Sequence, residues 1–430
     1  MRYVSLSLLT VACVLPACRT ATTAPQPSTP QPLAALTPNL AHLEHLYDEI
    51  VLPAGDTGGV VWIYCEAPDY TLLDDDDEGY TCVDDMARAL VAYAMHHELR
   101  GDALSRKRVT QLARTIVSLQ ADNGYFYNFL WPDNTINRNF KTSVAEPDWW
   151  SWRALWALEV ALSQNLLDEA DASVAEVACG RVVVNVARDF PLAGEPRDTI
   201  IAALRLPNDL PAGGGADQVA VLVMGLSRYA ARTGDTTGRS RVSGFAERLM
   251  AMQTAGGRSL SWYNHWHAWG NSQSYALQAA GRQFGEGRWA QAGRREVSTF
   301  LPEYLAAGRV AEGVATSRAI TPHVPARLPQ MLVWRYDTFP QIAYGRRPMV
   351  WAALEAARQT GDSVYVSRAE QAAAWFSGDN VAGVPMYDPT TGRGYDGIIS
   401  ATEVNYNAGA ESTIEALLSV LALAMAEKEQ

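Results

Sequence analysis

The sequence predicts an all-α protein whose helices pair into six hairpins and close into an (α/α)6 barrel, with long loops on one face. Three observations predict it. Apolar residues recur at intervals of three and four along most of the chain, as they do on the buried face of a helix. A short Gly-Asp turn recurs between helices, and the loops between the resulting pairs are long and rich in aromatic and polar residues. An open helical solenoid has the same local pattern and is the alternative fold.

The N-terminus does not belong to this pattern. Arg2 precedes an apolar run from Val4 to Leu15, which is too short to span a membrane and is typical of a signal peptide. Leu15-Pro16-Ala17-Cys18 resembles a bacterial lipobox, in which the cysteine is lipidated and becomes the mature N-terminus. We therefore expect an exported protein, anchored by lipid on Cys18 to the cell envelope. Ordinary signal-peptide cleavage near Ala17 is the alternative.

These features divide the chain into three parts. Residues 1–18 form the lipoprotein signal peptide. Residues 19–36 are rich in Thr, Pro, Ala and Gln and are expected to form a flexible tether. Residues 37–430 form the barrel domain.

Helical periodicity covers most of that domain. Leu90, Ala94 and Leu99 illustrate the spacing, and a strand signal is confined to short runs such as residues 60–64. The pattern predicts helices near residues 39–50, 83–99, 104–120, 147–164, 167–189, 216–233, 238–253, 270–284, 287–306, 338–359, 363–377 and 409–427.

An internal repeat supports the pairing of these helices. A glycine ends one helix and an acidic residue caps the next, because glycine adopts left-handed backbone geometry and carboxylates accept hydrogen bonds from the first amides of a helix. The four turns are Gly101-Asp102, Gly234-Asp235, Gly285-Glu286 and Gly361-Asp362.

Charge and cysteine content limit the partners. A net charge of −12 argues against a nucleic-acid partner, which requires a basic surface. Cys65 and Cys82 flank the acidic run from Asp74 to Glu78 and could form a disulfide in an exported protein. That run lacks the glycine and spacing of a calcium loop, so a solvated loop is favoured, and we expect no metal or cofactor.

Polar residues gather at the starts of alternate helices, which would meet at one mouth of a closed barrel. An N-cap explains one acidic or amide residue per helix, but it does not explain doubled acids beside histidines, tryptophans and tyrosines. The six groups are Asp84 and Asp85; Glu146 and Asp148 before Trp149 and Trp150; Asp217; Asn264, His265 and His267; Asp337; and Glu403 and Glu411.

The last group belongs to a stretch that is especially suited to carbohydrate chemistry. Between Pro385 and Leu418 the chain carries Tyr387, Asp396 and Asn407 in addition to its two glutamates. Carboxyl groups transfer protons, and amides, hydroxyls and aromatic rings bind sugars. The stretch therefore indicates a sugar-binding site at the start of a buried helix.

Two motifs resemble the six-hairpin glycosidase superfamily. Val83-Asp84-Asp85-Met86-Ala87-Arg88-Ala89 is similar to an early Asp-Asp-x-Ala-Arg-Ala motif of uncharacterised members, and Asn407-Ala408-Gly409-Ala410-Glu411-Ser412-Thr413 is similar to their late Gly-Ala-Glu-Ser-Thr motif. A looser likeness to family-nine cellulases places Glu403 before a Tyr-Asn-Ala segment. Because Glu403 lies closer to Asn407 than in those enzymes, Glu403 and Glu411 both remain candidates for the acid.

The resemblance implies a glycoside hydrolase that acts on an oligo- or polysaccharide. We expect inversion, with Asp84 or Asp85 as the base and Glu411 or Glu403 as the acid. The expected sugar platforms are Tyr125, Trp149, Trp150, Trp262, Trp266 and Trp334. The other expected substrate contacts are Glu146, Asp148, Asp217, Asn264, His265, His267, Arg335, Asp337, Tyr387, Asp396 and Asn407. The carbohydrate is the expected partner, the membrane is contacted only through the lipid anchor, and a monomer is favoured.

Two other functions fit the same residues. A polysaccharide lyase or sugar epimerase would abstract a proton with His265, His267 or a tyrosine, assisted by an arginine. A surface glycan-binding lipoprotein would use the same groups for binding without turnover.

Overall fold

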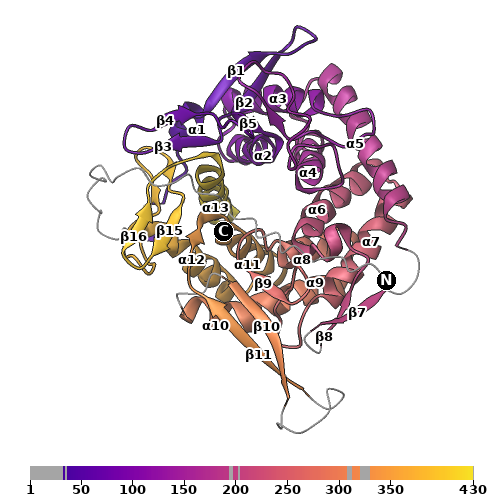
Figure 1. The fold of residues 1–430 in the computed structure, drawn as a ribbon, viewed down its shortest axis with the longest axis vertical. Helices are drawn as coiled ribbons and strands as arrows, with labels where there is room; N and C mark the ends of the chain where they lie inside the picture. Colours follow the sequence, from indigo (N-terminus) through magenta and orange to yellow (C-terminus); the bar gives the residue numbers. More distant parts are fainter. Residues whose placement is uncertain are drawn as a thin grey trace.

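The computed structural model describes residues 32–33, 36–192, 197–201, 204–307, 312–319 and 330–429. In this part of the chain, six helices form a closed inner ring, in which each packs against the next and the last against the first (Figure 1). In ring order they are α2 (Val83–Arg100), α4 (Trp149–Ser163), α6 (Ala216–Thr233), α8 (Gln273–Phe284), α11 (Arg347–Thr360) and α13 (Ala410–Glu429).

Other helices surround the ring. Except for α1, which precedes the first inner helix, they lie in the connections between inner helices and run along the outside. A π-helical turn over Glu296–Phe300 joins α9 to α10. The short α1 lies beside α13, where the ring has no long outer helix (Figure 1). The outer helices are α1 (Ala41–His45), α3 (Ala103–Ser118), α5 (Glu169–Asp189), α7 (Thr236–Ala251), α9 (Gly287–Arg295), α10 (Leu301–Ala307) and α12 (Ser363–Ser377).

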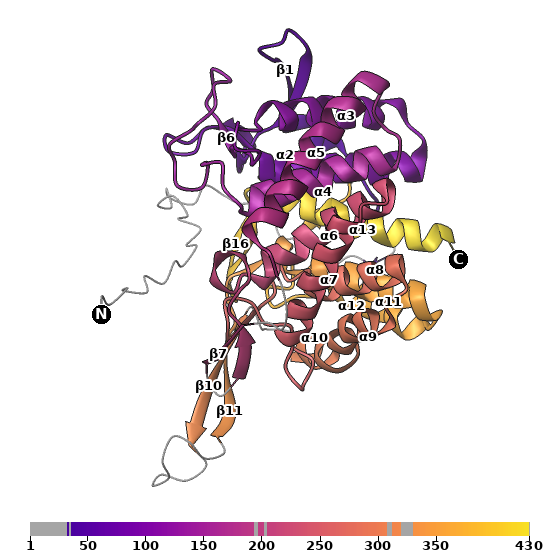
Figure 2. The ribbon, with the colours of Figure 1, turned by 90° about the vertical axis from the view of Figure 1, so that its right-hand side faces the viewer.

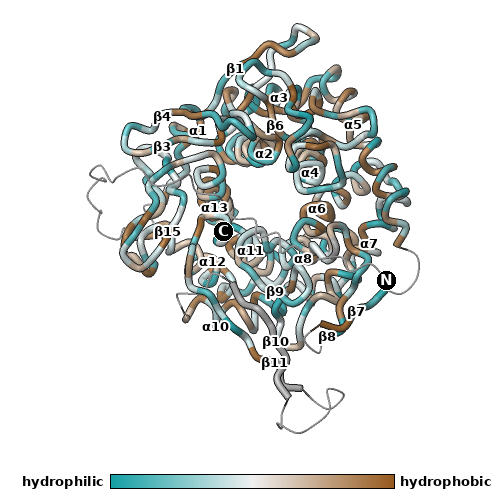
Figure 3. Tube along the Cα trace, in the orientation of Figure 1, coloured by the Kyte–Doolittle hydropathy of each residue, from teal (hydrophilic) through white to brown (hydrophobic). Residues whose placement is uncertain are grey.

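The core lies between the two rings and continues into the inner one. Along α4, every residue from Trp150 to Leu162 is buried, as expected for a helix with neighbours on all sides. Hydrophobic residues accordingly recur along helices of both rings (Figure 3). All four predicted glycines adopt left-handed geometry after a helix, and Asp102, Asp235 and Asp362 cap the next helix as predicted, with Asp102 accepting a hydrogen bond from Ser105 N. The predicted cap at Glu286 is not made, because its side chain accepts no hydrogen bond at the start of α9.

The strands are antiparallel, and most of them lie at the end of the barrel where the inner helices begin, whereas the β1–β2 hairpin packs against the outer helix α3 (Figure 2). The long loops therefore lie on one face, as predicted. The paired strands are β1 (Tyr47–Val51) with β2 (Thr57–Val61), β3 (Tyr64–Glu66) with β4 (Thr71–Leu73), β5 (Thr81–Cys82) with β6 (Phe129–Leu130), β7 (Asp198–Ile201) with β8 (Leu204–Pro207), and β13 (Tyr387–Asp388) with β14 (Arg393–Gly394). Two sheets have three strands: β9 (His265–His267), β10 (Glu312–Ala319) and β11 (Gln330–Asp337); and β12 (Gln341–Ile342), β15 (Gly397–Ser400) and β16 (Glu403–Asn405).

Two predicted helices are wrong in part. The first ends at His45, and residues 47–51 form β1, because pairing with β2 outweighs an apolar spacing that also fits a helix. The helix predicted from residue 338 begins at Arg347. Strands and a 3-10 turn precede it, and the β10–β11 hairpin was not predicted.

The disulfide between Cys65 and Cys82, which the sequence left open, is not formed. Cys65, Cys82 and Cys179 are buried free thiols in the described residues. Cys82 instead caps the N-terminus of α2, where its sulfur accepts a hydrogen bond from Asp85 N. The signal peptide, Cys18 and most of the tether lie outside the described residues. None of the described helices is both long and apolar enough to cross a membrane.

Candidate active site

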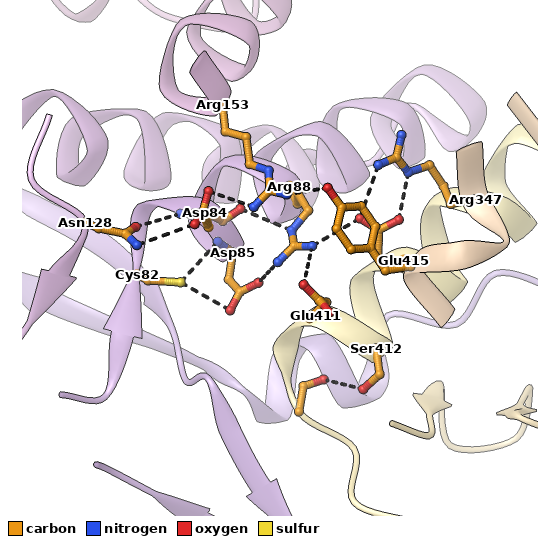
Figure 4. Close-up of polar contacts among 12 residues, drawn as sticks. Cys82, Asp84, Asp85, Arg88, Asn128, Arg153, Arg347, Glu411, Ser412 and Glu415 are labelled. Carbon is orange, nitrogen blue, oxygen red and sulfur yellow. Dashed lines mark hydrogen bonds and ion pairs between the residues drawn. The ribbon is translucent and has the colours of Figure 1, made fainter. Parts of the chain in front are cut away.

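Arg88 lies where the first and last inner helices meet. Its guanidinium contacts Asp85 Oδ1 at 2.5 Å, Glu411 Oε2 at 2.9 Å and Glu415 Oε1 at 3.2 Å (Figure 4). Asp85 precedes Arg88 by three residues on α2, and Glu411 and Glu415 are one turn apart on α13, so each helix presents its charges on one face. Closure of the barrel thus brings the early and late acidic motifs together.

Two further arginines extend this arrangement around the ring. Arg153 of α4 pairs with Asp84 Oδ1 at 2.7 Å and donates to the Tyr344 hydroxyl at 2.5 Å. Arg347 of α11 pairs with Glu415 Oε2 at 2.7 Å. All three guanidiniums lie over the Tyr344 ring, at 5.2 to 5.7 Å from its centroid. We call this set the mouth cluster: Asp84, Asp85, Arg88, Arg153, Tyr344, Arg347, Glu411 and Glu415.

The start of α13 is fixed from both ends of the chain. Ala410 N donates to Ile63 O at 2.9 Å. A Cβ on Gly409 would lie 2.6 Å from the same carbonyl oxygen, so only glycine allows this approach. Asp396 Oδ1 accepts from Ser412 Oγ at 2.6 Å and from Gly409 N at 3.3 Å. These contacts place Glu411 against α2 and explain the Gly-Ala-Glu order of the late motif.

The carboxyl side chains of the mouth cluster differ in their exposure to solvent. The Glu411 side chain is 44% exposed and that of Asp84 is 19% exposed. Asp85, Glu415 and the three arginines are buried. Glu411 and Asp84 are therefore the charged members that solvent reaches most easily, and the guanidiniums are less accessible than they are.

Two acids near the mouth hold their protons more tightly than usual. Burial raises the pKa of Glu411, and the charges of Asp85 and Glu415 raise it further, although Arg88 lowers it. Burial also raises the pKa of half-buried Asp148 to about 6, with added contributions from Asp84, Glu146 and Asp217. Asp148 caps α4, accepting a hydrogen bond from Trp149 N at 2.7 Å.

Asp217 joins the loop before β9 to the barrel. Its Oδ2 accepts from Trp262 Nε1 at 2.9 Å and lies 3.1 Å from His267 Nε2. The other ring nitrogen of His267 faces Trp269 O at 2.5 Å, so both nitrogens of this buried ring face oxygen atoms. Trp262 and Tyr263 have φ values of 48° and 66°, which are uncommon for bulky residues and are found more often near functional sites.

The sheet β9–β10–β11 divides its residues between two faces. His267 is in register with Asp337 across β10, and His265 is in register with Arg335. Trp266 is in register with Tyr336 on the opposite face, where it packs on Phe300 with ring centroids 4.7 Å apart. The polar residues expected at the site, His265, His267, Arg335 and Asp337, therefore lie on one face of the sheet. On the other face, Trp266 packs against Phe300 of the barrel.

The remaining predicted site residues are dispersed. Three of the proposed platforms and Tyr387 are buried with their polar atoms hydrogen-bonded within the protein, so their rings are not open to a sugar: Tyr125, Trp150, Trp266 and Tyr387. Half-buried positions include Trp149, Trp262, Asn264, His265, Trp334, Asp396 and Asn407. The exposed positions are Glu146, Arg335, Asp337 and Glu403.

Sequence reasoning did not assign Arg153, Tyr344, Arg347 or Glu415 to the site. A signal was present for Glu415, which follows Glu411 by one helical turn, and for Arg153, which follows Asp148 by five residues at the start of the same helix. In the described part of the chain, no group of three or more His, Cys, Asp and Glu residues is arranged to hold a metal ion.

No protein-family model matches this sequence, and no curated protein matches it. Solved structures do match its fold. The cellobiose 2-epimerase of Bacillus thermoamylovorans has a TM-score of 0.59 at 8% identity over 86% of this chain and 92% of that one. A sugar epimerase from a ruminal bacterium has a TM-score of 0.58 at 11% identity, covering 84% and 91%. The unsaturated glucuronyl hydrolase of a Bacillus species has a TM-score of 0.53 at 13% identity, covering 91% and 94%. The predicted fold, a closed (α/α)6 barrel, is confirmed.

Proposed function

We propose that this protein is a carbohydrate-active enzyme that hydrolyses a glycosidic bond with two carboxyl groups at the mouth of its barrel. One observation supports this most directly. Asp84 is ion-paired with Arg153 at 2.7 Å, whereas burial and the charges of Asp85 and Glu415 raise the pKa of Glu411 even though Arg88 contacts it. Two carboxyl groups in different protonation states are what acid–base hydrolysis requires.

In the proposed reaction, Asp84 accepts a proton from a water molecule as the water oxygen attacks the anomeric carbon. The bond from that carbon to the leaving oxygen breaks, and Glu411 donates its proton to that oxygen. Arg153 holds Asp84 in position, and Arg88 does the same for Glu411.

The sequence left two candidates for the base, Asp84 and Asp85, and two for the acid, Glu403 and Glu411. Burial and contacts favour one candidate for each role. Asp85 is buried between Arg88 and the Cys82 thiol, so a water molecule has poor access to it. Glu403 is exposed on β16, and none of the contacts given for the described residues joins it to the mouth cluster. Asp84 and Glu411 are therefore the preferred pair.

Asp148 is the alternative proton donor. Its pKa of about 6 is suited to donation in mildly acidic solution, and burial is the largest cause of that shift. Its main neighbouring charge is Asp84, so the two carboxyl groups lie in the same part of the mouth. The pH dependence of a variant at this position separates the two donors.

A second function is favoured by His265 and the Asp217–His267 pair, since an imidazole beside a carboxylate can abstract a proton next to a carbonyl group. That chemistry would make the protein a sugar epimerase or isomerase. The fold matches named as epimerases are consistent with it. The contacts of His267 weaken this reading, because both of its ring nitrogens already face oxygen atoms.

One experiment separates these functions. The purified protein is incubated in D2O with a panel of oligosaccharides, and products are followed by NMR. Hydrolysis gives new reducing ends, and inversion gives first the anomer opposite to that of the substrate. Epimerisation instead gives a new sugar that carries deuterium at the exchanged carbon. Binding without either product would identify a glycan-binding protein.

The location remains a proposal from the sequence. We propose that Cys18 carries lipid and holds the barrel at the cell envelope by the tether. Support comes from the lipobox-like Leu15-Pro16-Ala17-Cys18 and from the composition of residues 19–36.

A further inference from the structure

The positive charges of the mouth cluster lie behind its negative charges. Arg88, Arg153 and Arg347 are buried, with 3%, 7% and 3% of their side chains exposed. Glu411 and Asp84 are the charged members whose side chains are partly exposed, at 44% and 19%. A sugar that enters the mouth therefore meets carboxyl groups before it meets any guanidinium.

Each of these arginines is already neutralised. Arg153 pairs with Asp84, Arg347 pairs with Glu415, and Arg88 contacts Asp85, Glu411 and Glu415. Three guanidiniums thus face four carboxyl groups, and protonation of Glu411 would only bring the cluster to neutrality. No positive charge is left over for an anionic ligand.

The side chains next to the cluster that influence Asp148 are also acidic. Asp148 is influenced by Asp84, Glu146 and Asp217, which are all acidic, and His267 lies against Asp217. The contacts given for the described residues bring no other lysine or arginine to the mouth cluster. A carboxylate placed beside Asp84 and Glu411 would meet like charges in a partly desolvated site, so electrostatic repulsion would weaken its binding.

We propose that the sugar unit bound at the mouth cluster is neutral or cationic, and that uronic acids and other anionic sugars are excluded from this subsite. The inference deepens the proposed function and rests on it for the expectation that a sugar binds here. The hydroxyl groups of a neutral sugar donate hydrogen bonds to carboxylates, and an amino sugar adds an ion pair.

Pairs of oligosaccharides that differ only in their carboxyl groups test whether the mouth cluster prefers neutral to acidic sugars. Acidic oligosaccharides from uronate-containing polysaccharides are compared with the same oligosaccharides after reduction of each carboxyl group to a primary alcohol. Dissociation constants are measured by calorimetry at low salt. We expect every pair that binds to favour the reduced, neutral member by about tenfold or more. Tighter binding of the acidic member would overturn the inference and leave the proposed function standing.

A variant tests whether the mouth cluster is responsible. Asp84→Asn removes one negative charge and leaves Arg153 without its carboxylate partner. The ratio of the dissociation constant of the acidic oligosaccharide to that of its reduced partner should therefore be about tenfold smaller in the variant than in the wild type. Glu403→Gln removes an exposed charge outside the cluster and serves as the matched control, with an unchanged ratio. An unchanged ratio in Asp84→Asn would place the selectivity elsewhere and overturn the assignment to this cluster. Failure of all ligands to bind either protein would overturn the proposed function and this inference with it.

Discussion

Arg88 and Glu411 are separated by 323 residues in the chain, yet their side chains meet at 2.9 Å. The contact joins α2 to α13 and closes the inner ring at its mouth. Arg88 is buried, and Asp85 and Glu415 on its other sides are buried too. The guanidinium therefore holds together carboxylates from both ends of the barrel domain.

Replacing Arg88 should destabilise the protein strongly. Arg88→Met leaves Asp85 and Glu415 with less compensation in the interior, and breaking a buried ion pair in this way costs about 3–5 kcal/mol. Urea unfolding at neutral pH measures the change. Arg358→Met is the matched control, because the Arg358–Glu429 pair joins the C-terminal ends of two inner helices in an exposed position, where such pairs contribute about 1 kcal/mol or less. Equal effects of the two substitutions would contradict the role given to Arg88.

The proposed chemistry predicts large losses of turnover at two positions. Asp84→Asn and Glu411→Gln should each lower kcat by about a hundredfold or more, because each removes a proton-transfer group. Binding of a neutral oligosaccharide should persist in Glu411→Gln. Steady-state kinetics and calorimetry check both statements, with Glu403→Gln as the control that retains activity. Full turnover in both variants would exclude this pair from the mechanism.

The pH dependence of kcat should show whether Asp148 is the proton donor. If Asp148 donates the proton, kcat falls as pH rises through about 6, because the carboxyl group must be protonated to act. Asp148→Asn would then lower kcat and abolish this limb of the pH profile. If Glu411 is the donor, the limb persists in Asp148→Asn and disappears in Glu411→Gln. Measuring kcat from pH 4 to 9 in both variants identifies the donor.

Titration of the buried Glu296 should make the free energy of unfolding depend on pH, whatever the catalytic mechanism. Its Oε1 accepts from Ser259 N at 2.9 Å and from Trp266 Nε1 at 3.0 Å, and burial raises its pKa from 4.5 to about 7. The folded state therefore binds the proton more tightly than the unfolded state does. This stabilisation is complete below about pH 4.5 and is lost as pH rises through about 7.

Glu296→Gln keeps the accepting oxygen and removes this titration. The free energy of unfolding of the variant relative to the wild type should rise by about 3 kcal/mol between pH 4.5 and pH 8. Urea unfolding at the two pH values measures it. Glu427→Gln, at an exposed position of α13, should show no such change. A parallel response in the wild type and Glu296→Gln would show that Glu296 does not titrate in this window.

The proposed envelope location predicts a modified N-terminus. Mass spectrometry of the mature protein should find lipid on Cys18 as the first residue. Cys18→Ala should release the protein from the membrane fraction. A mature chain that begins after Cys18 without lipid would contradict the lipobox interpretation.

Much of the architecture could be predicted because its causes are local. Helical periodicity and the Gly-Asp turns depend on neighbouring residues, so the hairpins and the face that carries the long loops follow from the sequence. Strand pairing was harder to predict. Residues 47–51 have an apolar spacing that fits a helix, and only their hydrogen bonds to β2, a partner outside the local pattern, make them a strand.

The motifs also located the acidic ends of α2 and α13 without showing which acid faces the mouth. Successive residues on a helix point about 100° apart, so Asp84 and Asp85 have different environments although they are neighbours. Asp84 reaches Arg153 and remains accessible, whereas Asp85 is buried against Arg88. The orientation of α2 in the closed ring decides this difference.

By itself, the sequence determined the helical hairpins, their turns and the positions of the acidic motifs, because backbone propensities and caps act over a few residues. The tertiary structure alone decided that Arg88, Arg153 and Arg347 converge on Tyr344 and that Glu411, rather than Glu403, joins them. Those contacts join residues from four different inner helices and the turn before one of them. Their geometry depends on closure of the ring, which no local pattern specifies.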